Sequence, residues 1–324
     1  APDNQVLNLG QLLASGGRIG MYGGLLRQGG IANANTAVVG ENGKIVFKAT
    51  KDVTLDAGSL TTASGPSGGS VTAQAETGTL LASGTIEAKG DAGKGGTVQL
   101  LGNRVGLIGS ASVDVSGQTG GGTVLVGGDF QGRNPEIQNA SQTLIEPDVT
   151  IRADAVQSGD GGTVIAWGDA TTQFYGTISA SGGANSGNGG FVEVSGQYLD
   201  FSGVVNTLAP NGSTGSLVLD PQNLTVANIG SAAIPTGFAN PADTGTVTIS
   251  PTSLQTALQG SDVTLFANTD ITFSNSISVA SGASNLTLRA GRSEIIGNNV
   301  SISIGGKFDA TFNDSGATSA NRSA

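Results

Sequence analysis

The feature that most constrains the fold of this chain is a short motif that recurs along it at a nearly constant interval. Two small residues, usually Gly-Gly or Gly-Thr, come before an aliphatic residue, as in Gly96-Thr97-Val98. The aliphatic residues of nine copies stand at positions 19, 45, 71, 98, 124, 164, 192, 217 and 247, so the intervals are 26, 26, 27, 26, 40, 28, 25 and 30 residues. Self-similarity at a period of roughly 20–50 residues indicates a repeat protein.

Each repeat also contains short segments in which apolar and polar residues alternate, such as Val53-Thr54-Leu55 and Ile86-Glu87-Ala88. Alternation with a period of two is typical of a strand that turns one face inward. A unit of this length cannot bury its own apolar face, so successive units must stack. We therefore predict an all-β fold, a right-handed parallel β-helix with about 26 residues per coil. Its hand is expected from the general preference for right-handed parallel crossovers.

Two other repeat folds fit less well. A β-propeller blade needs about 40–45 residues and four antiparallel strands, and leucine-rich repeats need leucine at fixed positions with an asparagine ladder. The composition also favours thin stacked strands joined by tight turns, because 54 of the 324 residues are glycine. Aromatic residues make up 4% and charged residues 12%, which suits neither a deep globular core nor a disordered chain.

Several kinds of chemistry are excluded by residue content. The chain has no cysteine and no histidine, so it has no disulfide, thiolate nucleophile or imidazole base. Its net charge of −10 makes nucleic acid an unfavourable partner. No apolar run approaches the roughly 20 residues of a membrane span, so no membrane span is expected. The N-terminal residues 1–4 do not resemble a signal peptide, and we expect that such a peptide was removed or that the chain is a segment of a longer protein.

One interval of the repeat is too long. The step from 124 to 164 exceeds 26 residues by 14, which predicts an insertion at about 127–145 that projects from the rod. Insertions in solenoids gather on binding faces, so this loop is our candidate ligand contact. The alternative is a surface loop that covers apolar coil edges. The residues proposed for ligand contact are Asp129, Phe130, Gln131, Arg133 and Asn134.

The repeat divides the chain into three parts. Residues 1–220 are predicted to form the regular coils, and 221–262 an irregular connection with a short helix at about 251–259. Ser250 is the expected N-cap of this helix, Pro251 its first residue and Gly260 its end. Residues 263–324 are predicted to form further, shorter coils and a frayed C-terminus.

The longer segments around the repeats resemble filamentous haemagglutinin-like exoproteins of two-partner secretion. The resemblance spans most of the chain and is strongest at 9–20, 153–167, 189–196 and 209–221, for example in Gly189-Gly190-Phe191-Val192-Glu193. It implies a right-handed β-helix, export through an outer-membrane partner, and adhesion or display at the surface of Gram-negative bacteria. The family's Asn-Pro-Asn-Leu type motif is absent, so the chain resembles an interior segment.

Parallel β-helices also include polysaccharide-degrading enzymes, which need clustered carboxylates in a groove. The candidate carboxylates are Asp129, Asp154, Asp160, Asp169, Asp200 and Asp220. Asp160 stands where neighbouring repeats have other turn-forming residues, which favours a ladder of turns over a catalytic site. Trp167 and Tyr175 are either sugar-stacking aromatics or packing residues.

Calcium binding at the turns is a further hypothesis for this chain. Asp and Asn recur in the predicted turns, and Ca²⁺ prefers oxygen ligands. The Gly-Gly-x-Gly-x-Asp calcium repeat does not recur, so no cofactor is expected.

From these features we expect a secreted, non-enzymatic protein of the bacterial cell surface, a structural and adhesive rod. Its expected partners are flanking coils of the same exoprotein or other copies end to end, the outer-membrane secretion partner, and a host or bacterial surface glycan or protein. Assembly into an extracellular filament is the alternative, and a carbohydrate-active enzyme fits less well.

Overall fold

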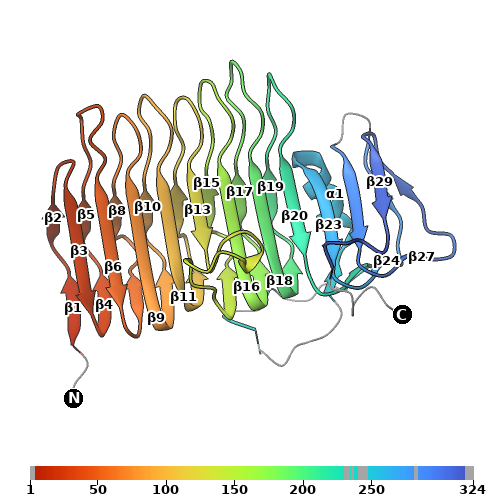
Figure 1. Ribbon diagram of the computed structural model, residues 1–324, viewed down its shortest axis with the longest axis horizontal. Helices are drawn as coiled ribbons and strands as arrows, with labels where there is room; N and C mark the ends of the chain where they lie inside the picture. The colour runs from red at the N-terminus through yellow and green to blue at the C-terminus, as the bar shows by residue number, and fades with distance from the viewer. Residues whose placement is uncertain (1–3, 230–233, 235–236, 240–246, 281–283, 318–324) are drawn as a thin grey trace.

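The chain folds into a parallel β-solenoid of about 10 turns, spaced about 27 residues apart, as predicted. The computed structural model describes residues 4–229, 234, 237–239, 247–280 and 284–317. Its strands lie side by side in rows that run from the N-terminal to the C-terminal end of the molecule (Figure 1). Every pair of neighbouring strands in the described residues is parallel, because each strand pairs with the equivalent strand of the next coil.

Most strands belong to two long sheets. The main sheet consists of β1 (Gln5–Asn8), β3 (Arg18–Gly23), β4 (Leu25–Gln28), β6 (Lys44–Ala49), β7 (Val53–Leu55), β9 (Ser70–Ala82), β11 (Thr97–Leu107), β13 (Thr123–Val126), β14 (Gln142–Ile145), β16 (Thr163–Phe174), β18 (Phe191–Phe201), β20 (Ser216–Asp220), β23 (Asp262–Ala267), β26 (Leu286–Ala290) and β29 (Phe308–Thr311). The second sheet consists of β2 (Gln11–Leu13), β5 (Ile31–Asn33), β8 (Leu60–Thr62), β10 (Thr85–Glu87), β12 (Ser112–Asp114), β15 (Thr150–Arg152), β17 (Thr177–Ser179) and β19 (Val204–Asn206).

Two small sheets follow toward the C-terminus. One contains β21 (Leu224–Val226), β22 (Val247–Ile249), β24 (Ile271–Phe273) and β27 (Glu294–Ile296), and the other β25 (Ile277–Ser278) and β28 (Ile302–Ser303).

The register of the main sheet follows the repeat motif. The aliphatic residues at 19, 45, 71, 98, 124, 164, 192 and 217 pair one with the next, which confirms eight of the nine predicted positions. The ninth, Val247, is wrong. Leu217 pairs with Val263, and the ladder continues to Leu286 and Phe308, whereas Val247 lies in β22 and pairs with Leu224.

This error has a physical cause. A three-residue motif of Gly, Thr and Val fits any strand that follows a tight turn, so it does not specify which sheet the strand joins. The neighbouring Gly245 and Thr246 lie outside the described residues.

The core is a single cluster of small aliphatic side chains inside the coils. Val98, Val124, Val164 and Val192 are fully buried and stacked in adjacent coils. The strand spacing of about 4.8 Å brings equivalent side chains into contact from coil to coil, which explains why β-branched residues recur at these positions.

The insertion and the helix also appear. The main chain leaves the sheet after β13 and returns at β14, so residues 142–145 of the predicted range 127–145 are a regular strand. Helix α1 (Pro251–Gly260) begins after Ser250, whose hydroxyl accepts a hydrogen bond from the Ser253 amide at 2.9 Å, as predicted for an N-cap. It packs beside β19 and β25, where it takes the place of a strand in the stack. The predicted frayed end lies in part, at 318–324, outside the described residues.

None of the helices in the described part of the chain is long and apolar enough to cross a membrane.

Candidate functional site

The insertion, which we call the flap and define as residues 127–141, lies over the outward side of the main sheet, in front of β16 (Figure 1). It contains a short 3-10 helix, η1 (Phe130–Gly132). The Phe130 ring meets the edge of Phe191 at a centroid distance of 5.6 Å. Beneath the flap, Leu125 and Ile165 are buried although they lie outside the core cluster. The flap therefore covers an apolar surface between coils, the second of the two predicted roles.

Trp167 is the anchor of the flap. A Cβ added to Gly132 would lie 2.7 Å from the indole, and one added to Gly128 would lie equally close. Gly132 also has φ +60°, which favours glycine. The indole Nε1 donates to the Asp169 carboxylate at 2.7 Å, and Asn139 of the flap donates to the same oxygen at 3.1 Å. The flap is thus fastened to β16 by packing and by hydrogen bonds.

Three polar side chains lie on this outward face of the next two coils. Glu193 and Ser195 are on β18 and fully buried, and Asp220 at the end of β20 is 9% exposed. Ser195 pairs directly with Asp220 in the register of the sheet. The Gln131 amide nitrogen donates to Glu193 Oε2 at 3.1 Å, and its side-chain nitrogen lies 3.5 Å from Asp220 Oδ2. Gln131 therefore connects the flap to both carboxyls.

These two carboxyls are abnormal in their acidity. Burial raises the pKa of Glu193 to about 7. The hydrogen bond from the Gln131 backbone amide acts to lower this pKa and offsets part of the rise. Burial also raises the pKa of Asp220 to about 7, and the nearby Glu193 carboxyl raises it further. Desolvation and mutual repulsion are the usual causes of such upward shifts.

A pocket of about 210 Å³ opens beside the flap. Its lining side chains come from four neighbouring coils and are mostly polar: Trp167, Asp169, Gln197, Asp220, Gln222 and Asn268. The pocket thus joins the flap anchor, Trp167, to one of the two buried carboxyls. In the described residues no group of three or more His, Cys, Asp or Glu side chains is placed to hold a metal ion.

The five residues predicted for ligand contact have different surroundings. Phe130 and Gln131 face the sheet through the contacts above. Asp129 accepts hydrogen bonds from the Phe130 amide at 2.7 Å and from the Asn134 side chain at 2.7 Å, which shapes the flap itself. Arg133 is exposed, and its charge acts to lower the pKa of both buried carboxyls. Their role in ligand contact stays a prediction.

The other candidate aspartates serve turns and neighbouring strands. Asp160 accepts from the Asn188 amide at 2.7 Å, and the Asn188 side chain accepts from the Ser213 amide at 2.9 Å. This is the predicted ladder of turns, in which each side chain holds the backbone of the next coil. Asp154 holds the Ser181 amide at 2.7 Å in the same way, and Asp200 accepts from the Tyr175 hydroxyl at 2.7 Å.

Glu193 was not among the predicted residues. A signal for it exists in the sequence, because the aligned positions in neighbouring coils are Leu125, Ile165 and Val218. A glutamate at a position that is aliphatic in the neighbouring coils, close to an insertion, indicates a buried carboxyl. The predicted repeat positions 124, 164, 192 and 217 already give this register, so the residue that follows each of them could have been compared in the sequence.

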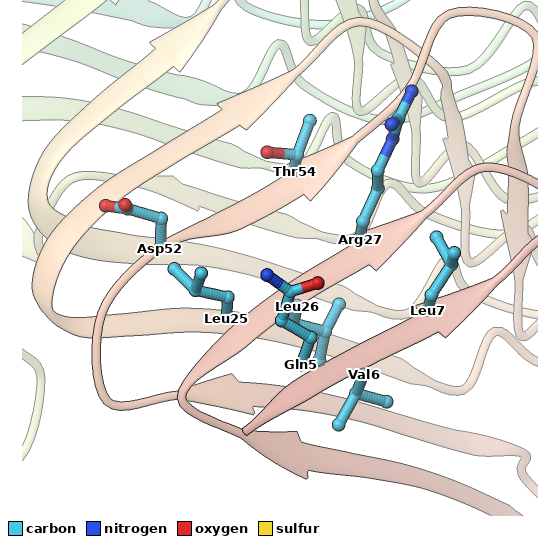
Figure 2. Close-up of a pocket in the computed structure, with 8 residues that line it drawn as sticks. All are labelled: Gln5, Val6, Leu7, Leu25, Leu26, Arg27, Asp52 and Thr54. Atoms are coloured by element: carbon cyan, nitrogen blue, oxygen red, sulfur yellow. The ribbon is translucent and has the colours of Figure 1, made fainter. Parts of the chain in front are cut away.

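A second pocket lies at the N-terminal end of the solenoid and has a volume of about 320 Å³ (Figure 2). It is lined by side chains of β1, β4 and β7 and of the turn before β7: Gln5, Val6, Leu7, Leu25, Leu26, Arg27, Asp52 and Thr54. Leu7, Leu9 and Leu13 are more than half exposed there. β1, β2 and β3 each pair with only one other strand of the described residues, so their outer edges are open.

Comparison with known proteins gives little beyond this geometry. No family model matches the chain. No curated protein matches it either. Among solved structures, it is similar to the HMW1 secretion domain from Haemophilus influenzae, with a TM-score of 0.40 and 23% sequence identity over 64% of this chain. The chain spans 64% of that domain's length.

Proposed function

We propose that this chain is a structural and adhesive rod of a secreted bacterial surface exoprotein, which mediates attachment or surface display. The observation that supports this most is the unbroken ladder of the main sheet, in which each coil from Ile19 to Phe308 pairs in register with the next. Such a stack is stiff because every coil is held by backbone hydrogen bonds on both sides.

The rod presents exposed side chains at a fixed distance from the cell. Phe130 is 46% exposed on the flap, beside the exposed Arg133. An aromatic and an arginine on a protruding loop suit contact with a glycan or protein. The resemblance to haemagglutinin-like exoproteins supports export through an outer-membrane partner and a place at the cell surface.

Attachment is tested with beads coated with the purified chain and applied to host-cell and bacterial surfaces. We expect coated beads to be retained several-fold more than albumin-coated beads. The double variant F130A/R133A should reduce this retention, whereas Asp148→Asn, an exposed aspartate outside the flap, should leave it unchanged. Retention no better than albumin on every surface contradicts the adhesive role.

A filament subunit is the second candidate, and the two ends of the solenoid favour it. The open edges of β1, β2 and β3 have counterparts in β27, β28 and β29, which also pair on one side only in the described residues. Leu7, Leu13, Phe308 and Phe312 are exposed at these ends. Since all strands of the described residues are parallel, the C-terminal edge of one copy can pair with the N-terminal edge of the next. Such head-to-tail contacts do not form a closed ring and therefore build an open filament.

Sedimentation velocity separates the two candidates. The variant L7K/L13E places charges at the open N-terminal edge. Sedimentation coefficients that increase with concentration in the wild type but not in this variant favour the filament. A single slow species at all concentrations favours the rod.

No catalytic activity is part of the proposal. Asp154, Asp160 and Asp200 are engaged with turns or neighbouring strands, and Glu193 is fully buried beneath the flap. Cleavage of polysaccharides by the purified chain that is abolished in E193Q/D220N would contradict this part of the proposal.

A further inference from the structure

The buried polar cluster beneath the flap has three oxygen atoms with no hydrogen-bond partner. They are Glu193 Oε1, Ser195 Oγ and Asp220 Oδ1. The three side chains are at least nine-tenths buried. An acceptor that is buried without a partner costs about 1–3 kcal/mol, and more when it is charged. Three such atoms on neighbouring positions of one sheet face are unfavourable unless a further group binds to them.

The register of the sheet brings these atoms together. Ser195 stands opposite Asp220, and Glu193 lies two residues before Ser195 on the same strand, so all three side chains leave the same face of the sheet. The Ser195 hydroxyl is near enough to lower the pKa of Glu193, although it does not reach hydrogen-bonding geometry. Gln131 spans the two carboxyls from above, and its bond to Asp220 is long, at 3.5 Å.

The charge of this cluster has no direct counter-ion. Neither carboxyl forms an ion pair with a lysine or arginine of the described residues. The charged groups that face the pair are Arg133 and Asp129 of the flap and Arg289 of β26, and they act only at a distance. Two neighbouring buried carboxylates without a counter-ion are unfavourable unless a proton or a cation lies between them.

We propose that Glu193, Ser195 and Asp220, together with Gln131 of the flap, form a binding site for a hard divalent cation of the calcium type. All donors are oxygens, which suits Ca²⁺, and no histidine or cysteine is available in this chain for softer metals. If the side-chain amide of Gln131 is rotated by half a turn, its oxygen takes the place of its nitrogen. That oxygen then faces a cation bound beside Asp220.

One of the proposed ligands, Asp220, borders a pocket, whereas Glu193 and Ser195 are fully buried and do not line it. Asp220 lines the pocket of about 210 Å³, which leaves room for water molecules to complete the coordination of a cation. Because Gln131 belongs to the flap and the carboxyls to β18 and β20, a bound cation ties the flap across two coils. The proposed ligands are strand and flap residues, not the turn aspartates considered for calcium above.

Terbium luminescence tests this site in the intact chain. Trp167 is the only tryptophan and lines the same pocket as Asp220, so it can transfer energy to a Tb³⁺ ion bound there. After removal of metals with EDTA, Tb³⁺ titration should give saturable emission that Ca²⁺ reverses. In E193Q/D220N the affinity should fall about tenfold or more, whereas Asp148→Asn should bind as the wild type does.

Two controls keep the result interpretable. Circular dichroism in EDTA checks that the variants are folded, and titration calorimetry with CaCl₂ on the wild type gives a readout independent of any variant. Saturable binding in both experiments, lost in the double variant, supports the site. Emission unchanged in the folded double variant, or no heat of Ca²⁺ binding in the wild type, overturns it and leaves a shared proton as the occupant.

Discussion

At the residue scale, the coils approach each other most closely at the glycine pairs of the repeat. A Cβ added to Gly162 would lie 2.0 Å from the Gly122 carbonyl oxygen, and one added to Gly122 would lie 2.1 Å from that of Gly96. No real side chain tolerates such distances, so the repeated glycine is required by stacking. This is why the motif keeps Gly before its aliphatic residue in coil after coil.

Alanine substitutions test this requirement. We expect Gly162→Ala to lower the free energy of unfolding by roughly 2–4 kcal/mol, since the backbone of two coils must move apart. Gly10→Ala is the matched control, because nothing lies within 4 Å of its added Cβ. Equal effects of the two variants in urea denaturation would refute the stacking explanation.

The buried carboxyls make stability depend on pH. The pKa values of Glu193 and Asp220 are raised to about 7 in the folded chain. Between the unfolded pKa values near 4 and the folded values near 7, the folded chain binds more protons than the unfolded chain. The stabilisation is therefore complete below about 4 and is lost as the pH rises through about 7. In EDTA we expect the free energy of unfolding to fall by roughly 3 kcal/mol or more across this window.

The variant E193Q/D220N should flatten this pH profile, measured by urea denaturation between pH 4 and about 8. A wild-type profile that rises through the same window would contradict the assignment. The repeat aligns position 192 with 217, so the sequence already sets Ser195 opposite Asp220 and Glu193 on the same face. What the repeat does not encode is how the flap folds over this face and contacts both carboxyls through Gln131.

At the scale of elements, local signals predicted the helix better than the strands around it. Ser250, Pro251 and Gly260 are sufficient to mark α1, because capping depends on a few neighbouring residues. The strand at Val247 has no such signal. Val247 pairs with Leu224 in the small sheet and not with Leu217 of the main sheet, a difference that the three-residue motif does not encode.

The cap of α1 gives a prediction at this scale. Replacement of Ser250 by alanine removes the hydrogen bond that it accepts from Ser253 and should cost about 1 kcal/mol of stability. Thermal unfolding followed by circular dichroism measures the loss. Exposed Thr252→Ala, in the same turn, is the control and should have a smaller effect. Indistinguishable melting of Ser250→Ala and the wild type would show that packing against β19 and β25 holds the helix without its cap.

At the scale of the whole molecule, the fold follows from the period. The step of 26 residues fixes one coil, and the constant step from Ile19 to Val124 makes the stack regular. What the period leaves open is the path of the longer connections, since the flap and the segment after Asp220 depart from it. These departures are where the candidate site lies, between the flap and the last regular coils.

Electron microscopy of the purified chain at several concentrations shows whether the molecule is a solenoid rod. With about 10 turns at the strand spacing of about 4.8 Å, we expect uniform short rods about 50 Å long, unchanged by concentration. Compact particles of no fixed length would contradict the solenoid rod. Long fibres at high concentration would contradict the proposed single rod and make end-to-end assembly the function.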